Sequence, residues 1–202
     1  MRVAERELKV KMLLHICCAP CSTATVEAWR LDAVELTGVF FNPNIHPFAE
    51  HERRYQTLLA YAGTIGLPLI GEPRYDIKAW LSQVQGKEEK GIRCRVCIAE
   101  RLRHTAELAA AGGFEAFSTT LAISPYQDHE IIREEGERAA ARSGSKFIYR
   151  DLRPSYRRSR ELSRQAELYR QNYCGCIFSE LEAALARAAR REAKKSTPDA
   201  NG

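Results

Sequence analysis

Short apolar runs alternate along the chain with longer segments in which apolar residues recur every three or four positions. The short runs are rich in β-branched and aromatic residues, which is typical of buried strands. The longer segments have the spacing of amphipathic helices. The pattern predicts strands at residues 11–16, 35–41, 67–70, 114–120 and 146–149. It predicts helices at residues 22–31, 49–65, 97–111, 126–142, 156–171 and 178–191, and a short helix that begins near Asp76.

This alternation indicates βαβ units, which form parallel sheets covered by helices on both faces. Because crossover connections are right-handed, we expect a doubly wound α/β fold with a mainly parallel sheet of about five strands and helices at the C-terminal end. Residues 1–195 are predicted to form one α/β catalytic domain, with an Arg- and Tyr-rich helical part from about residue 150. Residues 196–202 are predicted to form a disordered tail.

Several polar candidates follow the predicted strands. Cys17 and Cys18 follow the first strand, Asn44 follows the second, and Thr119 and Ser124 follow the fourth. Ligands of doubly wound folds bind outside the carboxyl ends of the strands. We therefore expect these residues at one edge, with Asn44, Thr119 and Ser124 contacting substrate. For Asn44 and Ser124 the alternative is that each caps the helix that follows it.

The seven cysteines fall into three tight groups. A lone buried cysteine is an ordinary small hydrophobe, whereas clustered cysteines in a reducing compartment are typical of metal ligands or redox groups. An all-sulfur ligand set with thiols to spare favours an iron–sulfur cluster over structural zinc, although spacing alone does not separate the two. The groups are Cys17, Cys18 and Cys21; Cys94 and Cys97; Cys174 and Cys176. A zinc site needs four ligands, which Cys17, Cys18, Cys94 and Cys97 could supply.

The net charge and the N-terminal residues indicate the kind of partner and the compartment of the protein. The chain has 31 basic and 26 acidic residues, and its net charge of +5 favours a polyanionic partner. The first residues are charged and lack the apolar core of a secretory signal, and no apolar run is long enough to span a membrane. We therefore expect a cytoplasmic protein with reduced thiols and no membrane association.

The strongest signal for RNA lies in residues 149–173, which hold seven arginines and four tyrosines against three carboxylates. Guanidinium groups bind phosphates, and tyrosine rings stack on unpaired bases. We expect RNA contacts from Tyr156, Arg153, Arg157 and Arg158. A solvated helix face is the alternative explanation of the same pattern.

Five sequence blocks together resemble epoxyqueuosine reductase of the QueH type, and the resemblance extends over residues 12–180. The blocks are HICCAPC at 15–21, FNPNIHP at 41–47, CRVC at 94–97, TTLAISPYQ at 119–127 and YCGC at 173–176.

The resemblance implies an oxidoreductase of queuosine biosynthesis. It implies that epoxyqueuosine at the wobble position of tRNA anticodons is reduced to queuosine, a two-electron epoxide deoxygenation without cobalamin. The resemblance does not identify the electron donor. It also implies an adenine nucleotide α-hydrolase-like (HUP-like) fold. The family's [4Fe–4S] ligands correspond to Cys17, Cys18, Cys94 and Cys97, and its redox-active pair corresponds to Cys174 and Cys176.

Cys21 is the one thiol left without a role. Our hypothesis is that it takes part in catalysis or, with Asp76 and Cys174 or Cys176, binds an additional iron beside the cluster. The alternative for Asp76 is the N-cap of the helix that follows it.

Three other functions remain open from the residues. The first is an ATP-dependent enzyme like the tRNA sulfur transferases, although residues 17–21 lack the Ser-Gly-Gly-x-Asp-Ser loop that cradles pyrophosphate. The second is a zinc-stabilised RNA-binding module without catalysis. The third is a thiol oxidoreductase without metal.

Overall fold

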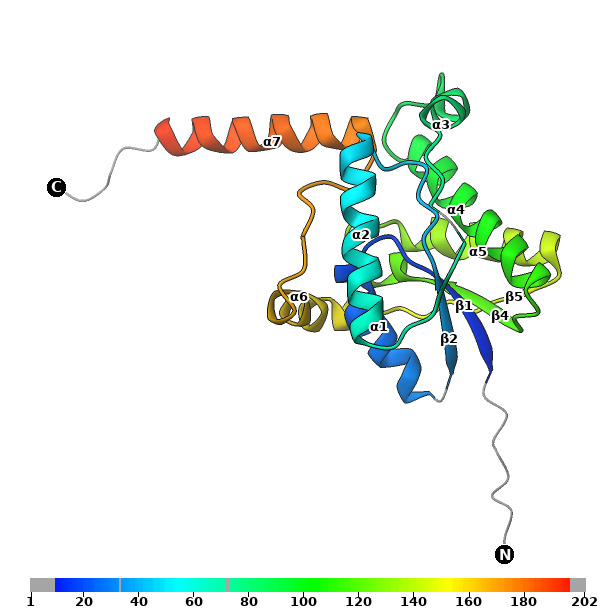
Figure 1. The fold of residues 1–202 in the computed structure, drawn as a ribbon. Coiled ribbons are helices and arrows are strands. Elements are labelled where there is room, and N and C mark those ends of the chain that lie inside the picture. Colours follow the sequence, from blue (N-terminus) through cyan, green and yellow to red (C-terminus); the bar gives the residue numbers. More distant parts are fainter. Residues whose placement is uncertain (1–9, 33, 72, 197–202) are drawn as a thin grey trace, which may run out of the picture.

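A parallel five-stranded sheet forms the centre of the computed structural model, which describes residues 10–32, 34–71 and 73–196 (Figure 1). All four pairings between neighbouring strands are parallel, and the spatial order is β3-β2-β1-β4-β5. The prediction of a doubly wound α/β fold is therefore confirmed. The strands are β1 Lys11–His15, β2 Glu35–Val39, β3 Leu69–Ile70, β4 Ala116–Thr119 and β5 Lys146–Phe147.

Helices cover both faces of the sheet, and alternate residues of β1 point into the two layers. Met12 and Leu14 belong to the apolar cluster formed with α1 and α2, whereas Leu13 belongs to the cluster formed with α4 and α5. Helix α6 packs on α1, and α7 extends away from the body (Figure 1). The helices are α1 Ala19–Leu31, α2 Phe48–Thr64, α3 Ile77–Val84, α4 Ile92–Ala111, α5 His129–Ser143, α6 Tyr156–Gln165 and α7 Ile177–Ser196, with short 3₁₀ turns η1 Thr120–Ile123 and η2 Arg153–Ser155.

Two helices begin earlier than the periodicity predicts. Helix α1 begins at Ala19, since Pro20 is tolerated in a first turn, and Ser22 is a buried residue of that turn rather than its cap. Helix α4 begins at Ile92, directly after Gly91 with φ of 95°. This start places Cys94 and Cys97 together in the first two turns of α4.

The predicted start of α5 and the predicted end of α6 were also wrong. Asp128, rather than Ser124, caps α5, because its carboxylate accepts a hydrogen bond from the Ile131 amide. Helix α6 ends at Gln165, shortly before Glu167, whose positive φ of 50° is unfavourable for a helix. Apart from Ser196, which ends α7, the predicted tail at 196–202 lies outside the described residues. Within the described residues, every helix is too short or too polar to cross a bilayer.

Candidate metal and thiol site

The strand order reverses between β1 and β4, and the first cysteines lie at that point. Cys17 follows β1, and its amide donates a 3.1 Å hydrogen bond to Oγ1 of Thr120, which follows β4. The Thr120 hydroxyl lies 3.4 Å from the Cys17 sulfur. The chain therefore brings a thiol to the place where a doubly wound sheet opens to a ligand.

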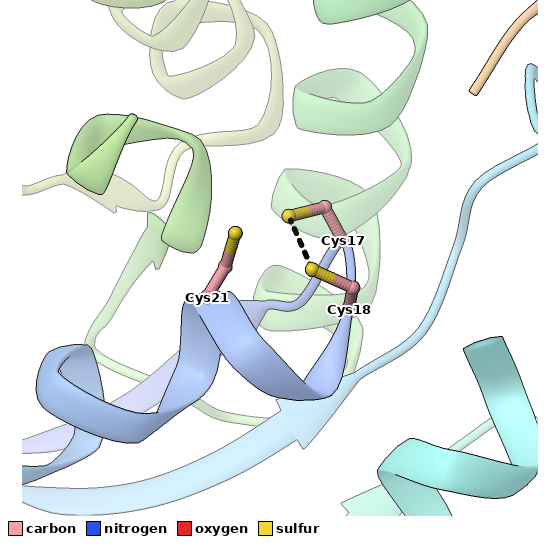
Figure 2. A group of neighbouring side chains, drawn as sticks. All are labelled: Cys17, Cys18 and Cys21. Carbon is pink, nitrogen blue, oxygen red and sulfur yellow. Dashed lines mark hydrogen bonds between the residues drawn. The ribbon is translucent and has the colours of Figure 1, made fainter. Parts of the chain in front are cut away.

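The thiols of Cys17, Cys18 and Cys21 face one another beside the first turn of α1 (Figure 2). Their sulfur atoms all lie within 4.8 Å of one another, and the Cys17 and Cys18 sulfurs are 3.8 Å apart. Three sulfurs bound tetrahedrally to one zinc at about 2.3 Å would be about 3.8 Å apart. The group therefore needs only small side-chain shifts to hold a thiophilic metal.

These three thiols do not share their charge equally. Hydrogen bonds with Cys17 and then Cys21 hold the pKa of Cys18 well below its usual value. The pKa of Cys17 is raised to about 11, mainly by the hydrogen bond between Cys17 and Cys18. The pKa of Cys21 is raised by its hydrogen bonds with Cys17 and Cys18. The group therefore carries one negative charge readily and resists more, unless a cation binds.

The other two cysteine groups lie near each other. The pKa of Cys97 is raised to about 12, mainly by burial and to a smaller extent by negative charge on Cys174, Cys176 or Cys94. The nearby Arg101 guanidinium acts in the opposite direction. One cysteine or more of each of the three groups raises the pKa of Arg101, so this side chain lies within electrostatic range of all three groups.

The loop that carries the last two cysteines is held by α2. Arg54 donates to the carbonyl oxygens of Cys174 at 2.8 Å and Tyr173 at 3.2 Å, while its Nε pairs with Glu50 at 2.7 Å. Both Arg54 and Glu50 are buried. Arg54 also favours the thiolate of Cys18, so it connects the loop with the first group.

The glycine between Cys174 and Cys176 is required by the same packing. A Cβ at Gly175 would lie 3.1 Å from Nδ2 of Asn44, and the Gly175 carbonyl accepts a 2.8 Å hydrogen bond from the His46 amide. Cys174 is exposed and Cys176 is buried. The structure thus places Asn44 beside this cysteine pair, buried and with its Oδ1 unpaired.

The predicted RNA residues lie on and before α6. Helix α6 packs on α1 through Ser159, whose hydroxyl donates to the Pro20 carbonyl at 2.6 Å, so its arginines face outward. The Arg157 side chain is 92% exposed, and Arg158 is half exposed with Glu27 at 3.5 Å. The Tyr156 ring meets that of the exposed Tyr126, with centroids 6.0 Å apart.

Arg153 forms the shortest ion pair of the three predicted RNA arginines. Its guanidinium contacts both carboxylate oxygens of Asp151 at 2.5–3.0 Å. These hydrogen bonds from Arg153 lower the pKa of Asp151 to about 2. A phosphate would therefore compete with Asp151 for this arginine.

Three predicted site residues make hydrogen bonds within the protein. Thr119 is buried, and its hydroxyl oxygen bonds to the His15 ring at 2.9 Å and accepts from the Leu121 amide at 3.1 Å. Ser124 accepts from the Tyr126 amide at 3.3 Å. Asp76 is exposed and caps α3 by accepting from the Ala79 amide at 2.9 Å. Among the described residues, the metal-ligand group contains Cys21 but not Asp76.

Sequence reasoning missed several residues that contact the thiols or their loop, among them two arginines and two glutamines that donate from their side chains. Arg101 donates to the Cys97 sulfur at 3.1 Å, Gln171 to Cys18 at 3.1 Å and Gln127 to Cys174 at 3.4 Å. Arg54 holds the loop carbonyls. Arg101 had a sequence signal, because four residues separate it from Cys97 within one helix, and Gln127 ends the TTLAISPYQ block.

The chain is similar to proteins of one family over most of its length. A family model described as epoxyqueuosine reductase QueH matches residues 12–182. Proteins named epoxyqueuosine reductase QueH are similar to it. The one from Dehalococcoides mccartyi is 40% identical over 172 residues, which cover 85% of this chain and 93% of the relative. The one from Haemophilus influenzae is 38% identical over 176 residues, covering 84% and 71%. The one from Thermotoga maritima is 35% identical over 178 residues, covering 85% and 91%.

A solved structure shares the fold. It is described as a predicted subunit of tRNA methyltransferase from Methanocaldococcus jannaschii, and its TM-score is 0.51. The sequences are 11% identical, and the match covers 76% of this chain and 74% of the other. At that identity the likeness supports the α/β fold alone.

Proposed function

The chain belongs to the epoxyqueuosine reductase QueH family, and we propose that it reduces epoxyqueuosine to queuosine in tRNA with the thiols at the carboxyl edge of its sheet. The observation that carries this proposal is the convergence of the Cys17, Cys18 and Cys21 sulfurs within 4.8 Å at the switch point of the sheet. Because its substrate is tRNA, we place the enzyme in the cytoplasm.

The donor set fits an iron–sulfur cluster, because every candidate ligand is a free thiol. We assign Cys17 and Cys18 to it together with Cys94 and Cys97 from the first turns of α4. Cys17 packs against the apolar cluster that contains Ile98 of α4, which supports the pairing of these two segments. When bound, a [4Fe–4S] cluster supplies single electrons and iron that can polarise an oxygen atom. Cys21 remains available for the reaction or for an additional iron, for which Asp76 stays a candidate ligand.

Cys174 and Cys176 account for the electrons and protons of the reaction. Conversion of an epoxide to an alkene and water consumes two electrons and two protons. Two thiols that form a disulfide release two electrons and two protons. The exposed thiol of Cys174 can reach a substrate, while buried Cys176 completes the pair. An external electron donor then restores both thiols.

The exposed tyrosines provide a surface for the nucleoside next to this pair. Tyr126 is 80% exposed and meets Tyr156, and the adjacent Gln127 donates to the Cys174 sulfur. A base that stacks on these rings would therefore lie beside the exposed thiol. Arg157 and Arg158 would bind the flanking phosphates.

Nucleoside analysis of tRNA that carries epoxyqueuosine tests this function. Anaerobically prepared protein with a chemical reductant, and without ATP, should convert the nucleoside to queuosine with loss of one oxygen. Cys174→Ser should leave the substrate unchanged. An unchanged nucleoside with the unaltered protein would contradict the function, and a sulfur-containing or ATP-dependent product would indicate the sulfur transferase chemistry that the family membership does not favour.

A further inference from the structure

Three arginines of the described residues are buried, and they differ in their partners. Arg54 pairs with Glu50, and Arg93 pairs with Glu182. Arg101 is 3% exposed, and none of the described carboxylates forms an ion pair with it. A buried cation without an anion costs several kcal/mol, so Arg101 requires a negative charge from another source.

The Arg101 guanidinium contacts Cys97. Its Nε donates to the carbonyl oxygen of Cys97 at 3.0 Å, and its Nη2 lies 3.1 Å from the Cys97 sulfur. Burial lowers the pKa of Arg101, but Cys97, Cys174, Cys17 and Cys94 outweigh that effect and raise it. The guanidinium is held rigidly, because its own helix supplies the sulfur and the carbonyl one turn earlier.

We propose that Arg101 is the counter-ion of the thiolate-bound cluster and sets its reduction potential. This inference rests on the cofactor proposed above. Four thiolates outweigh the charge of a [4Fe–4S] core, so the assembly is an anion and becomes more negative on reduction. A fixed cation 3.1 Å from one ligand sulfur stabilises the reduced form more than the oxidised form. The N–H···S hydrogen bond acts in the same direction.

The test is the midpoint potential of the cluster in the full-length holoenzyme, followed anaerobically by its visible and EPR spectra. Arg101→Gln removes the charge, and Arg101→Lys keeps it while losing the planar fork. Arg103→Gln is the matched control, because it removes the same charge from the same helix at a half-exposed site that Glu100 and Glu107 compensate. We expect Arg101→Gln to disfavour reduction at least tenfold, which is a fall of about 59 mV for a one-electron couple. Arg101→Lys should shift the potential less, and Arg103→Gln should not shift it.

The outcomes separate this inference from the proposed function. An Arg101→Gln protein that holds the cluster at the unaltered potential would overturn the inference alone, and so would an equal shift in Arg103→Gln. If Arg101→Gln holds no iron but Arg101→Lys does, the requirement for charge is supported. If neither variant holds iron while both remain folded by circular dichroism, shape rather than charge is required and the inference fails. An unaltered protein without any redox-active chromophore would overturn the cofactor proposal together with the inference.

Discussion

Replacement of Arg54 by Met should strongly destabilise the protein, because Arg54 is the buried link between α2 and the loop of Cys174 and Cys176. The side chains of Arg54 and Glu50 are 2% and 10% exposed and form a 2.7 Å ion pair. Loss of one partner from a buried pair costs about 3–5 kcal/mol, because the other charge is left uncompensated. For a chain of this size, each kcal/mol lowers the melting temperature by about 2–4 °C, so we expect a fall of about 6–20 °C.

The assay is thermal unfolding under anaerobic conditions, combined with the rate at which Cys174 is alkylated. The matched control is Arg53→Met, since Arg53 is exposed and its side chain, among the described residues, makes a cation–π contact with Tyr169, at 4.4 Å from the ring centroid. Such a contact contributes about 0.5–1 kcal/mol at an exposed site. The alkylation rate should rise in Arg54→Met, which frees the loop carbonyls, and should not change in Arg53→Met.

A double variant identifies the origin of the loss. Glu50→Gln combined with Arg54→Met removes the stranded carboxylate, so it should be more stable than Arg54→Met alone. If Arg54→Met unfolded within about 1 kcal/mol of Arg53→Met, the buried pair would not anchor the loop. An alkylation rate equal to that of the unaltered protein would refute the positioning of Cys174 by Arg54.

Three further predictions concern tRNA, the cysteine pair and pH. Joint replacement of Arg157 and Arg158 by Ala should weaken tRNA binding and reduce the slope of log K against log salt concentration by about 1.4–1.8, at about 0.7–0.9 per phosphate contact. The control Arg142→Ala, in the last turn of α5, should not change this slope. An equal slope in both variants would mean that the RNA binds elsewhere. Cys174→Ala should keep the iron content of the unaltered protein and lose turnover, whereas a parallel loss of iron would make Cys174 a ligand. Burial, and then the charge of His51, lowers the pKa of His46 to about 4, so the unfolded chain takes up its proton first. Stability of the metal-free protein in urea should be fully present above about pH 6.5 and fall towards pH 4, with His46 contributing up to about 1.4 kcal/mol per pH unit; an equal pH dependence in His46→Gln would contradict this.

The order of the elements and the edge that holds the site follow from the sequence for a clear physical reason. Strands buried on both faces must be apolar throughout, and the helices between them must be apolar on one side, so the two patterns differ. The residues that follow β1 and β4 therefore come together even though Cys17 and Thr120 are far apart in the chain.

Helix caps and side-chain partners could not be predicted from the hydrophobic pattern, because several residues compete for the same hydrogen bonds. Ser124 and Asp128 are both good helix caps, but Ser124 follows the 3₁₀ turn at Thr120–Ile123 and Asp128 caps α5. An arginine such as Arg101 is usually solvated, and only the packing of α4 turns it toward the thiols. Thr119 lies at the end of β4, as the pattern predicts, but its hydroxyl forms a hydrogen bond with the neighbouring His15 ring.

The iron and acid-labile sulfide content of anaerobically prepared protein, measured beside Cys94→Ala, tests the central claim most directly. The unaltered protein should be brown and hold about four iron and four sulfide per chain, as a [4Fe–4S] cluster requires. Cys94→Ala, which lacks one proposed ligand, should lose most of both. A colourless protein that holds zinc and no sulfide, or a Cys94→Ala variant with a complete cluster, would contradict the account.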